Sequence, residues 1–506
     1  MDYEHRIRCK ELLKKVVTAE EAAKMIKDGD TIGCSGFTPS GYPKAVPLAL
    51  AERVKAGEKI KVQILTGASV GPELDGLAAV GAISRRSPYQ TNNDMRNALN
   101  TKGEAGVLYN DQHLSNAPQD TRYGFMGDVD IALIEVCAIT EEGNLIPTTS
   151  VGSSPTFVKM AKKVIVELNT SQPEAMEGMH DIYIPLDPPN RREIPIYATG
   201  DRIGTTYIEC GADRIDAIVV TDITDKVRPL PPITETEQAM ANNIVKFFDG
   251  EVKAGRLPKN LLPLQSGVGG VANAVMAGFV NSDLEGLTFY SEVIQDGALD
   301  LIDCGKFVAV SGTSLTPSVD GLERFKANVE KYKKTIVLRP QEISNNPEVA
   351  RRIGVISMNT AIEVDIYGHV NSTHIMGTRM MNGIGGSGDF TRAAYISIFM
   401  TASTAKGGDI SSIVPMCSHI DHTEHDVNVI VTEQGYADLR NLAPRERALV
   451  IINNCAHPDY KPMLLDYYNR ALEACPDGKA HTPHILEEAL SWHVRFNKTG
   501  TMKLEK

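Results

Sequence analysis

The sequence predicts an α/β fold built on mainly parallel sheets. Short β-branched apolar runs recur along the chain, and their length and composition are typical of strands buried on both faces. Helical patterns alternate with these runs, which is the rhythm of α/β proteins. The chain has 506 residues. Because a single hydrophobic core stops growing near ~250–300 residues, we expect two domains of similar size.

The predicted strands lie in both halves of the chain. In the first half they are KVQIL, DIALIEV, KVIVEL and DAIVVTD, and in the second half they are FVAVSG, TIVLRP and VNVIVTEQ. The segment TAEEAAKMIKDGD predicts a helix, with Thr18 as its N-cap, Glu21 three residues later and Gly29 near its end.

A proline-rich segment, TDKVRPLPPITETE, marks the expected boundary near residues 223–235. We therefore predict one domain over residues 1–225 and a second over residues 226–506. The segments EVCAITEEGNLIPTTSVGSSPTFVKMA and EVDIYGHVNSTHIMGTRMMNGIGGSGDFTRAA share an order of Glu-Val, turn, polar strand and Gly/Ser loop. This similarity indicates two related halves, and convergent loop chemistry explains it equally well.

Composition and charge exclude several classes of function. Apolar residues make up 42% and charged residues 23%, as in soluble globular proteins, and the net charge of −12 argues against a nucleic-acid partner. No run of 18 apolar residues predicts a membrane span. The segment Met1–Lys14 lacks the apolar stretch of a signal peptide. Eight scattered cysteines without a CxxC pair are typical of a reduced, cytoplasmic protein.

Two glycine-rich segments are candidate ligand loops. SGVGGVANAV places Gly267, Gly269 and Gly270 before a helical run, where free N–H groups can meet an anion, although tight packing explains this loop as well. MMNGIGGSGDFTRAA carries four glycines around Ser387, before a helix expected near Asp389. Its N–H groups can form a nest for a phosphate or an oxyanion, and we favour a ligand-contacting loop here.

A carboxylate ends the apolar run in LTFYSEVIQDGALDLID. Glu292 follows the predicted strand, and ligands of open α/β sheets bind at strand ends. Carboxylates also form covalent acyl intermediates, so Glu292 is a candidate nucleophile. A capping or salt-bridged glutamate is the commoner explanation of such a residue.

Two further patterns have a chemical and a structural interpretation. SHIDHTEHD contains residue types that bind metals, but it lacks HExxH order and precedes a predicted strand, so we favour a hydrogen-bonded turn and predict no metal site. Cys34 lies beside a glycine loop without an identifiable base, which favours a small buried cysteine over a nucleophile. The residues of the first pattern are His419, Asp421, His422, Glu424, His425 and Asp426.

Taken together, these segments resemble the acetyl-CoA hydrolase/transferase family, and most closely its succinyl-CoA:acetate CoA-transferase branch. The resemblance covers almost the whole length. It implies two related open α/β domains of the CoA-transferase type, usually a homodimer, with the active site between the domains. The matching segments are GFTPSGYPKAVP, TGASVGPELDG, PTTSVGSSPTFV, GVGGVANAV, SEVIQDG, NTAIEVDIYGHVNSTHIMGT, NGIGGSGDF and VTEQGYADLR.

The same resemblance implies roles for individual residues. Glu292 would form a glutamyl-CoA thioester and Asn345 would position it, while the N–H groups of Val268 and Gly386 would bind the oxyanion. Ser69 and Glu433 are secondary candidates for the carboxylate side of the pocket. The implied CoA site consists of Gly267, Val268, Gly269, Gly270, Val271, Ile362, Asn382, Gly386 and Lys406.

The expected activity is transfer of CoA from an acyl-CoA to a small carboxylate, with succinyl-CoA and acetate as the favoured pair. Propionate, butyrate and 4-hydroxybutyrate are alternative acids, and no permanently bound cofactor is expected. A hydrolase of the same fold, in which water resolves the thioester, is the nearest alternative, although protection of the intermediates from water favours transfer. An acyl-CoA-binding sensor and a metal-dependent hydrolase built on residues 419–426 are the remaining alternatives.

Overall fold

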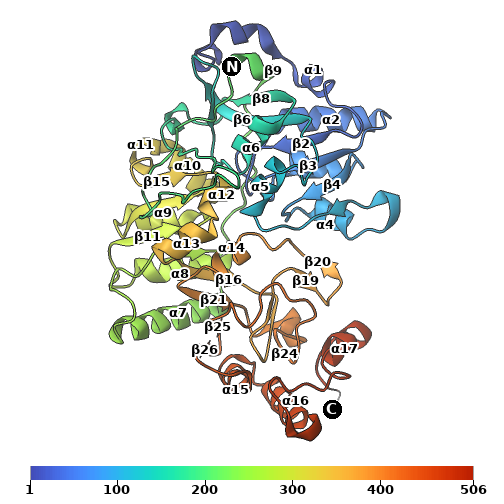
Figure 1. Cartoon of the computed structure of the whole chain (residues 1–506), viewed down its shortest axis with the longest axis vertical. Helices are drawn as coiled ribbons and strands as arrows, with labels where there is room; N and C mark the ends of the chain where they lie inside the picture. Colours follow the sequence, from blue (N-terminus) through green and yellow to red (C-terminus); the bar gives the residue numbers. More distant parts are fainter. Residues whose placement is uncertain (1, 505–506) are drawn as a thin grey trace. The chain divides into compact units, whose positions relative to one another are not determined.

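The computed structural model describes residues 2–504. The chain divides into two compact units, which Figure 1 traces in sequence colours. Unit 1 comprises Met1–Leu230 and Thr288–Ile353, and unit 2 comprises Pro231–Leu287 and Gly354–Lys506. The domain limits expected from the sequence, 1–225 and 226–506, stay a prediction. The two compact units are defined by contacts in space, whereas the expected limits describe continuous sequence domains. The end residues of those limits, 1 and 506, lie outside the described residues.

The large sheet of unit 1 has nine strands in the order β1-β9-β8-β6-β2-β3-β4-β5, with β7 paired to β6. Its pairs are parallel except for the antiparallel pair β6–β7. The strands are β1 (Val16–Val17), β2 (Thr31–Cys34), β3 (Val62–Leu65), β4 (Ile83–Ser87), β5 (Leu108–Tyr109), β6 (Ile131–Ile139), β7 (Leu145–Pro147), β8 (Lys163–Asn169) and β9 (Ile215–Thr221).

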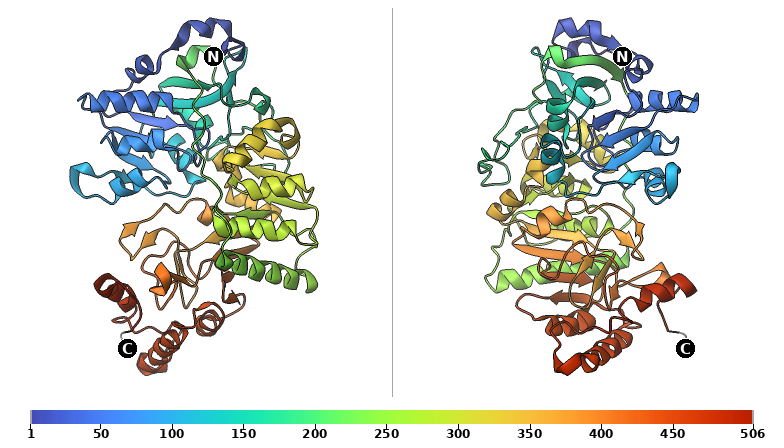
Figure 2. Two further views of the ribbon diagram at one scale, coloured as in Figure 1. Left: turned by 180° about the vertical axis from the view of Figure 1, so that it is seen from behind. Right: turned by 45° about the vertical axis from the view of Figure 1, so that its right-hand side comes forward.

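Helices pack on this sheet from both faces (Figure 2). Ile32 and Cys34 of β2 join one buried cluster with α1 (Ala19–Ala23) and α2 (Ala45–Lys55). Gly33 lies between them and faces the opposite side, where a Cβ atom would meet the ring of Phe157 at 2.5 Å. Glycine at this position therefore lets α6 (Ser154–Met160) approach the sheet. The other helices before β9 are α3 (Pro72–Asp75), α4 (Asn93–Leu99) and α5 (Asn116–Arg122).

Residues 288–353 complete unit 1. Their strands follow the order β15-β13-β11, and β12 pairs in parallel with β14. The elements are β11 (Leu287–Tyr290), β12 (Val293–Ile294), α9 (Asp296–Asp303), β13 (Phe307–Gly312), β14 (Ser314–Leu315), α10 (Val319–Ala327), α11 (Val329–Tyr332), β15 (Ile336–Leu338), α12 (Gln341–Ser344) and α13 (Pro347–Ile353).

A buried ion cluster fixes the chain that follows β9. The Nζ atom of Lys44 lies 2.5 Å from Oε2 of Glu135 and 2.9 Å from Oδ1 of Asp225, and all three side chains are buried. Thr149 also donates a hydrogen bond to Asp225 at 2.7 Å. Burial raises the pKa of Glu135 to about 7. Because charges are retained in a protein interior only when they are paired, this cluster ties residue 225 to the sheet.

The main strands of unit 2 follow the order β10-β16-β21-β25-β26, and these pairs are parallel except for the last. Helices α7 and α15 both contact β25 and β26. The helices and main strands of unit 2 are α7 (Glu235–Lys253), β10 (Leu264–Ser266), α8 (Gly270–Val280), β16 (Ile356–Thr360), α14 (Ser387–Thr391), β21 (Ile396–Met400), β25 (Val429–Thr432), β26 (Gly435–Asp438), α15 (Pro444–Cys455), α16 (Lys461–Ala474) and α17 (Ser491–Thr499).

Short strands form smaller ladders in the same unit, with β17 between β18 and β24, β19 paired with β20, and β22 paired with β23. They are β17 (Glu363–Asp365), β18 (Val370–Asn371), β19 (His374–Ile375), β20 (Arg379–Met380), β22 (Thr404–Ala405), β23 (Ile410–Ser411) and β24 (Ile413–Val414).

The structure confirms an α/β fold with mainly parallel sheets. Each of the seven apolar runs named from the sequence contains a strand, from β3 in KVQIL to β25 in VNVIVTEQ. The capping box of Thr18 and Glu21 is present. The helix it starts ends at Ala23, well before Gly29, because the following residues turn toward β2. No helix within residues 2–504 is both long and apolar enough to cross a membrane.

Candidate active site

Glu292 lies in the two-residue connection between β11 and β12, directly before β12. Its carbonyl oxygen accepts hydrogen bonds from the backbone N–H groups of Thr313 at 2.8 Å and Ser314 at 3.1 Å. These bonds join Glu292 to the connection between β13 and β14. The main chain at Glu292 is therefore held firmly, while the residue as a whole remains partly exposed.

Asn345 lies next to the Glu292 carboxylate. It is buried at the C-cap of α12, and its Nδ2 donates to Oε2 of Glu292 at 2.8 Å. The Oγ of Ser344 donates to Oδ1 of Asn345 at 2.8 Å, so the amide is oriented with its N–H group toward the carboxylate. A neutral amide donor orients a carboxylate without cancelling its charge.

Burial dominates the electrostatics of Glu292 and raises its pKa to about 7. The hydrogen bond from Asn345 acts in the opposite direction and favours the ionised form. These two influences, desolvation and one amide donor, account for the shift. A carboxylate that is partly desolvated and half ionised near pH 7 fits the needs of a nucleophile.

Apolar side chains pack around the residue that follows Glu292. Burial first, and then the charge of Glu292, raise the pKa of the Tyr89 phenol. This influence places Tyr89 near the carboxylate, a neighbour that the sequence analysis missed because nothing in the sequence links residues 89 and 292. The cluster consists of Phe37, Ala68, Leu114 and Val293, with Tyr89 packed against it.

Ser69 belongs to the same region of unit 1. It follows Ala68, which shares the apolar cluster with Val293. Its Oγ accepts a hydrogen bond from the backbone N–H of Thr91 at 3.1 Å and lies 2.6 Å from Oγ1 of Thr91. The structure therefore brings the Ser69 segment and the Glu292 segment together.

A cluster of hydroxyl groups, which the sequence analysis also missed, lies beside the β13–β14 connection. Oγ1 of Thr38 lies 3.1 Å from Oγ of Ser314, and Oγ1 of Thr316 donates to Oγ of Ser40 at 2.9 Å. Thr38 has a φ of +55°, a conformation that costs energy for a β-branched residue. The Ser/Thr content of GFTPSGYP is the signal that points to this cluster. Cys34, just before it, is buried, as expected.

The first glycine loop, Gly267–Gly270, connects β10 to α8 in unit 2. Gly269 is the N-cap of α8 with a φ of +119°. At Gly270 a Cβ atom would lie 1.7 Å from Oε1 of Glu237, so a larger residue there would require the Glu237 side chain to move. Val268 is exposed, although its side chain is apolar, which leaves this loop open to a ligand.

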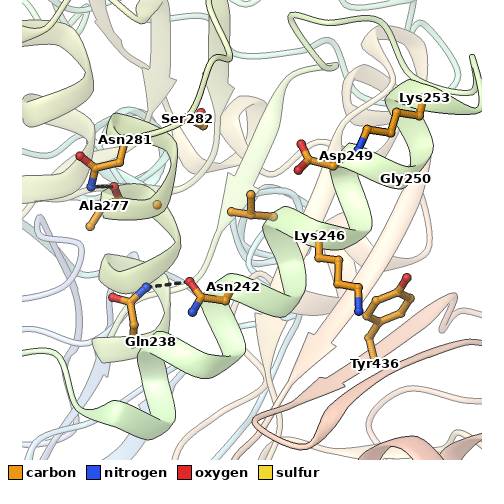
Figure 3. A pocket seen from close by; sticks show the side chains of 12 residues that line it. Gln238, Asn242, Lys246, Asp249, Gly250, Lys253, Ala277, Asn281, Ser282 and Tyr436 are labelled. Carbon is orange, nitrogen blue, oxygen red and sulfur yellow. Dashed lines mark hydrogen bonds between the residues drawn. The ribbon is translucent and has the colours of Figure 1, made fainter.

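A surface pocket of about 590 Å³ lies along α7 and α8. Figure 3 shows Gln238 donating to Asn242, and Lys246 pointing toward Tyr436. The pocket lining includes no residue of the predicted CoA site, so the pocket is separate from the glycine loop.

The second glycine loop, Asn382–Ser387, leads into α14. Nδ2 of Asn382 donates to the carbonyl oxygen of Ser372 at 3.1 Å, and Gly386 is the N-cap of α14. Gly385 has a φ of +62°, which a residue with a side chain rarely adopts. The helix expected to begin near Asp389 begins two residues earlier.

Two other predicted CoA contacts lie in short loops of unit 2. The backbone N–H of Ile362 donates to the carbonyl oxygen of Asn371 at 2.8 Å, next to the Ser372 carbonyl that Asn382 contacts. Lys406 has a φ of +49°, and its Nζ atom lies 5.6 Å from the ring centroid of Phe496. A cation held on an aromatic face at an exposed turn is suited to a phosphate.

The Glu433 side chain forms hydrogen bonds with neighbouring residues of unit 2. Its carboxylate accepts hydrogen bonds from the backbone N–H of Ser403 at 2.8 Å and from Nε2 of Gln434 at 3.0 Å. Burial pushes its pKa upward, but the side-chain and backbone bonds of Ser403 outweigh burial, so the pKa is lowered overall. Glu433 is therefore ionised and structurally engaged.

The segment from His419 to Asp426 forms a hydrogen-bonded turn that precedes β25. Within residues 2–504, no group of three or more His, Cys, Asp or Glu side chains is arranged to hold a metal ion.

Comparison with families of known proteins covers most of the chain. Residues 1–224 match the acetyl-CoA hydrolase/transferase N-terminal domain, and residues 321–468 match the acetyl-CoA hydrolase/transferase C-terminal domain.

Individual relatives match over nearly their full length. The chain is 58% identical to a succinyl-CoA:acetate CoA-transferase of Clostridium kluyveri, covering 99% of this chain and 92% of that protein. It is 43% identical to an acetyl-CoA hydrolase of Candida albicans, covering 99% and 98%. The crystal structure of RipA from Yersinia pestis has a TM-score of 0.72 at 22% identity, covering 94% and 100%, which supports the fold.

Proposed function

Because this chain belongs to the acetyl-CoA hydrolase/transferase family, we propose that it transfers CoA from an acyl-CoA to a small carboxylate through a thioester on Glu292. Succinyl-CoA and acetate are the favoured pair, following the relative that is 58% identical. The observation that carries this proposal is the desolvated Glu292 carboxylate, oriented by the Asn345 amide at 2.8 Å.

The reaction proceeds by exchange of acyl bonds. The Glu292 carboxylate attacks the thioester carbonyl, the C–S bond breaks, and an anhydride and a CoA thiolate form. The thiolate then attacks the glutamyl carbonyl, which releases the first acid and leaves the glutamyl-CoA thioester. The acceptor carboxylate reverses these steps. The negative charge passes from one group to the next, so no external proton or ATP is needed.

Each attack passes through a tetrahedral oxyanion. We assign the N–H groups of Val268 and Gly386 to this charge, and one such donor is typically worth ~2.7–4 kcal/mol. Both residues lie in glycine loops that begin helices, where free N–H groups favour anions. The remaining CoA contacts assigned are Gly267, Gly269, Gly270, Val271, Ile362, Asn382 and Lys406, with Ser69 and Glu433 on the carboxylate side.

We further propose a cytoplasmic homodimer that carries no permanent cofactor. The eight cysteines are unpaired in the described part of the chain, which supports a reducing compartment.

Hydrolysis is the second candidate, because a relative 43% identical is named an acetyl-CoA hydrolase. The two functions differ in the group that resolves the thioester. CoA-thioester exchange should depend on added acetate, and succinate should appear in step with acetyl-CoA. Release of free CoA at the same rate without acetate would assign the protein as a hydrolase.

The covalent step has its own test. Incubation with acyl-CoA followed by borohydride should inactivate the protein, because hydride reduces the glutamyl thioester to an alcohol. Peptide mass spectrometry should then locate the change at Glu292. An unmodified Glu292 in fully inactivated protein would contradict the proposed intermediate.

A further inference from the structure

The polar segment His419–Asp426 contains two residues connected to the second glycine loop, His422 by a direct bond to Ser387 and Asp421 through Ser372 and Thr373. We propose that Asp421 and His422 are positioning residues that hold the two ends of the Asn382–Ser387 loop. This inference rests on the proposed function, since Asn382 and Gly386 are there assigned to CoA and the oxyanion. It deepens that proposal by naming what keeps these groups in place.

Asp421 holds the first end of the loop through an intermediate segment. Its carboxylate accepts hydrogen bonds from the backbone N–H of Ser372 at 2.7 Å and from Oγ1 of Thr373 at 2.9 Å. The carbonyl oxygen of Ser372 accepts from Nδ2 of Asn382, and that of Thr373 accepts from the N–H of Met381 at 2.8 Å. The Asp421 side chain is only 5% exposed, so these bonds form in a water-poor environment.

His422 holds the other end directly. Its Nε2 lies 2.9 Å from Oγ of Ser387, the residue after Gly386. The same Oγ donates to the carbonyl oxygen of Ile384 at 2.9 Å. A hydroxyl has one proton, so Ser387 uses it toward Ile384 and must accept from His422. The imidazole therefore carries its proton on Nε2, and a directed chain runs from His422 through Ser387 to Ile384.

The imidazole itself is fixed. His422 is 4% exposed, its ring centroid lies 4.8 Å from that of Phe399, and its backbone pairs with Val370 in both directions. An anchor of this kind matters because the loop contains three glycines, which lose more conformational freedom on ordering than other residues. Preorganised N–H donors contribute to catalysis only when the supporting groups keep them in place.

The two anchors predict different kinetic defects. Loss of the His422 bond should misplace Gly386, so His422→Leu should lower kcat about 10- to 100-fold, in the range that a displacement of about 1 Å causes. Loss of the Asp421 charge should loosen Asn382, so Asp421→Asn should raise KM for acyl-CoA about tenfold with a smaller change in kcat. His422→Gln retains an N–H donor and should recover much of the lost kcat.

Matched controls and a coupling measurement complete the experiment. His425→Gln and Asp426→Asn alter the same segment, where the His425 side chain is 77% exposed, and should leave both constants unchanged. Ser387→Ala removes the bond to His422 together with the bond to Ile384, so it should lower kcat at least as much as His422→Leu does. The double variant should be no worse than Ser387→Ala, since the bond between the two residues is already lost in that single variant.

The experiment distinguishes a failure of the positioning roles from a failure of the proposed transferase mechanism. If Glu292→Ala is inactive while the Asp421 and His422 variants match the controls, the positioning roles are wrong and the transferase mechanism stands. If Glu292→Ala remains active, the covalent mechanism is wrong, and calorimetric titration with CoA still decides whether Asp421→Asn weakens binding. Equal changes in kcat and KM for both variants, with lowered melting temperatures, would make the two residues general stabilisers and overturn the inference.

Discussion

The Nδ2 atom of Asn345 lies 2.8 Å from Oε2 of Glu292, and Ser344 fixes the opposite side of the same amide. The carboxylate thus has one neutral, oriented donor in a desolvated setting. This pair explains how Glu292 can be both ionised enough to attack and poorly enough solvated to be reactive.

Replacement of the nucleophile should abolish exchange. Glu292→Ala should lower the rate of CoA transfer by at least about 10³-fold, because the variant lacks the carboxylate proposed to form the covalent intermediate. Initial rates with succinyl-CoA and acetate measure this loss. Glu285→Ala, an exposed glutamate a few residues earlier, is the matched control and should retain the parental rate. Parental exchange by Glu292→Ala would contradict the mechanism.

Removal of the amide donor should slow the reaction without abolishing it. Asn345→Ala should reduce kcat about 10- to 100-fold, because the carboxylate loses its orientation. The pKa of Glu292 should also rise further, since the Asn345 bond lowers it. Steady-state kinetics at several pH values measure both effects, with the exposed Asn100→Ala as control. An unchanged pH profile would show that Asn345 does not act on the carboxylate.

The activity should depend on pH through Glu292. Since attack needs the ionised form and the pKa is about 7, kcat/KM for acyl-CoA should rise about tenfold per pH unit below 7 and level off above it. Profiles from pH 5.5 to 9 test this. A flat profile across pH 6–8 would mean that ionisation of Glu292 is not required in the rate-limiting step.

Ionisation of the Glu292 carboxylate should also lower the free energy of unfolding at high pH. Its folded pKa is raised from 4.5 to about 7, so its contribution to stability is greatest below pH 4.5 and is lost as pH rises through 7. Glu292→Gln should therefore raise the free energy of unfolding at pH 8 by up to about 3 kcal/mol, at 1.36 kcal/mol for each pKa unit. At pH 4.5 the difference should vanish. Denaturant titrations at both pH values, with Glu285→Gln for comparison, decide it.

The buried ion cluster should be sensitive to loss of its cation. Lys44→Met leaves Glu135 and Asp225 buried without their positive partner and should destabilise the protein by about 3–5 kcal/mol. Thermal melts measure this change. Lys55→Met disrupts an exposed pair with Glu52 and should cost less than about 1 kcal/mol. Equal melting temperatures for the two variants would refute the role of the cluster.

Much of the fold could be predicted because its strands are apolar on both faces. Runs such as DIALIEV and KVIVEL are long enough to mark β6 and β8 without ambiguity. The sequence predicts too long a helix after Thr18, since Met25 and Ile26 continue the apolar pattern although the helix has already ended at Ala23. The membership of residues 288–353 in unit 1 had no local signal, because long-range contacts define it.

The candidate site was only partly visible in the sequence. Glu292 and the glycine loops stand out because carboxylates at strand ends and clustered glycines are unusual. Tyr89 lies near Glu292, and Thr38 lies near Ser314, only because the fold brings together chain segments more than 200 residues apart. No rule of sequence spacing predicts these contacts. The roles assigned to individual residues stay predictions until the variants are measured.

The backbone carbonyl oxygen of Glu292, which accepts two hydrogen bonds, has a consequence for turnover. Because these bonds hold the main chain in place, the acyl and CoA groups on Glu292 can move only by rotation about its side-chain torsions. Free and acylated forms of unit 1 should then superpose in their backbones near residue 292 and differ in a rotamer. Catalysis at this strand end should therefore involve side-chain rotation on a fixed backbone.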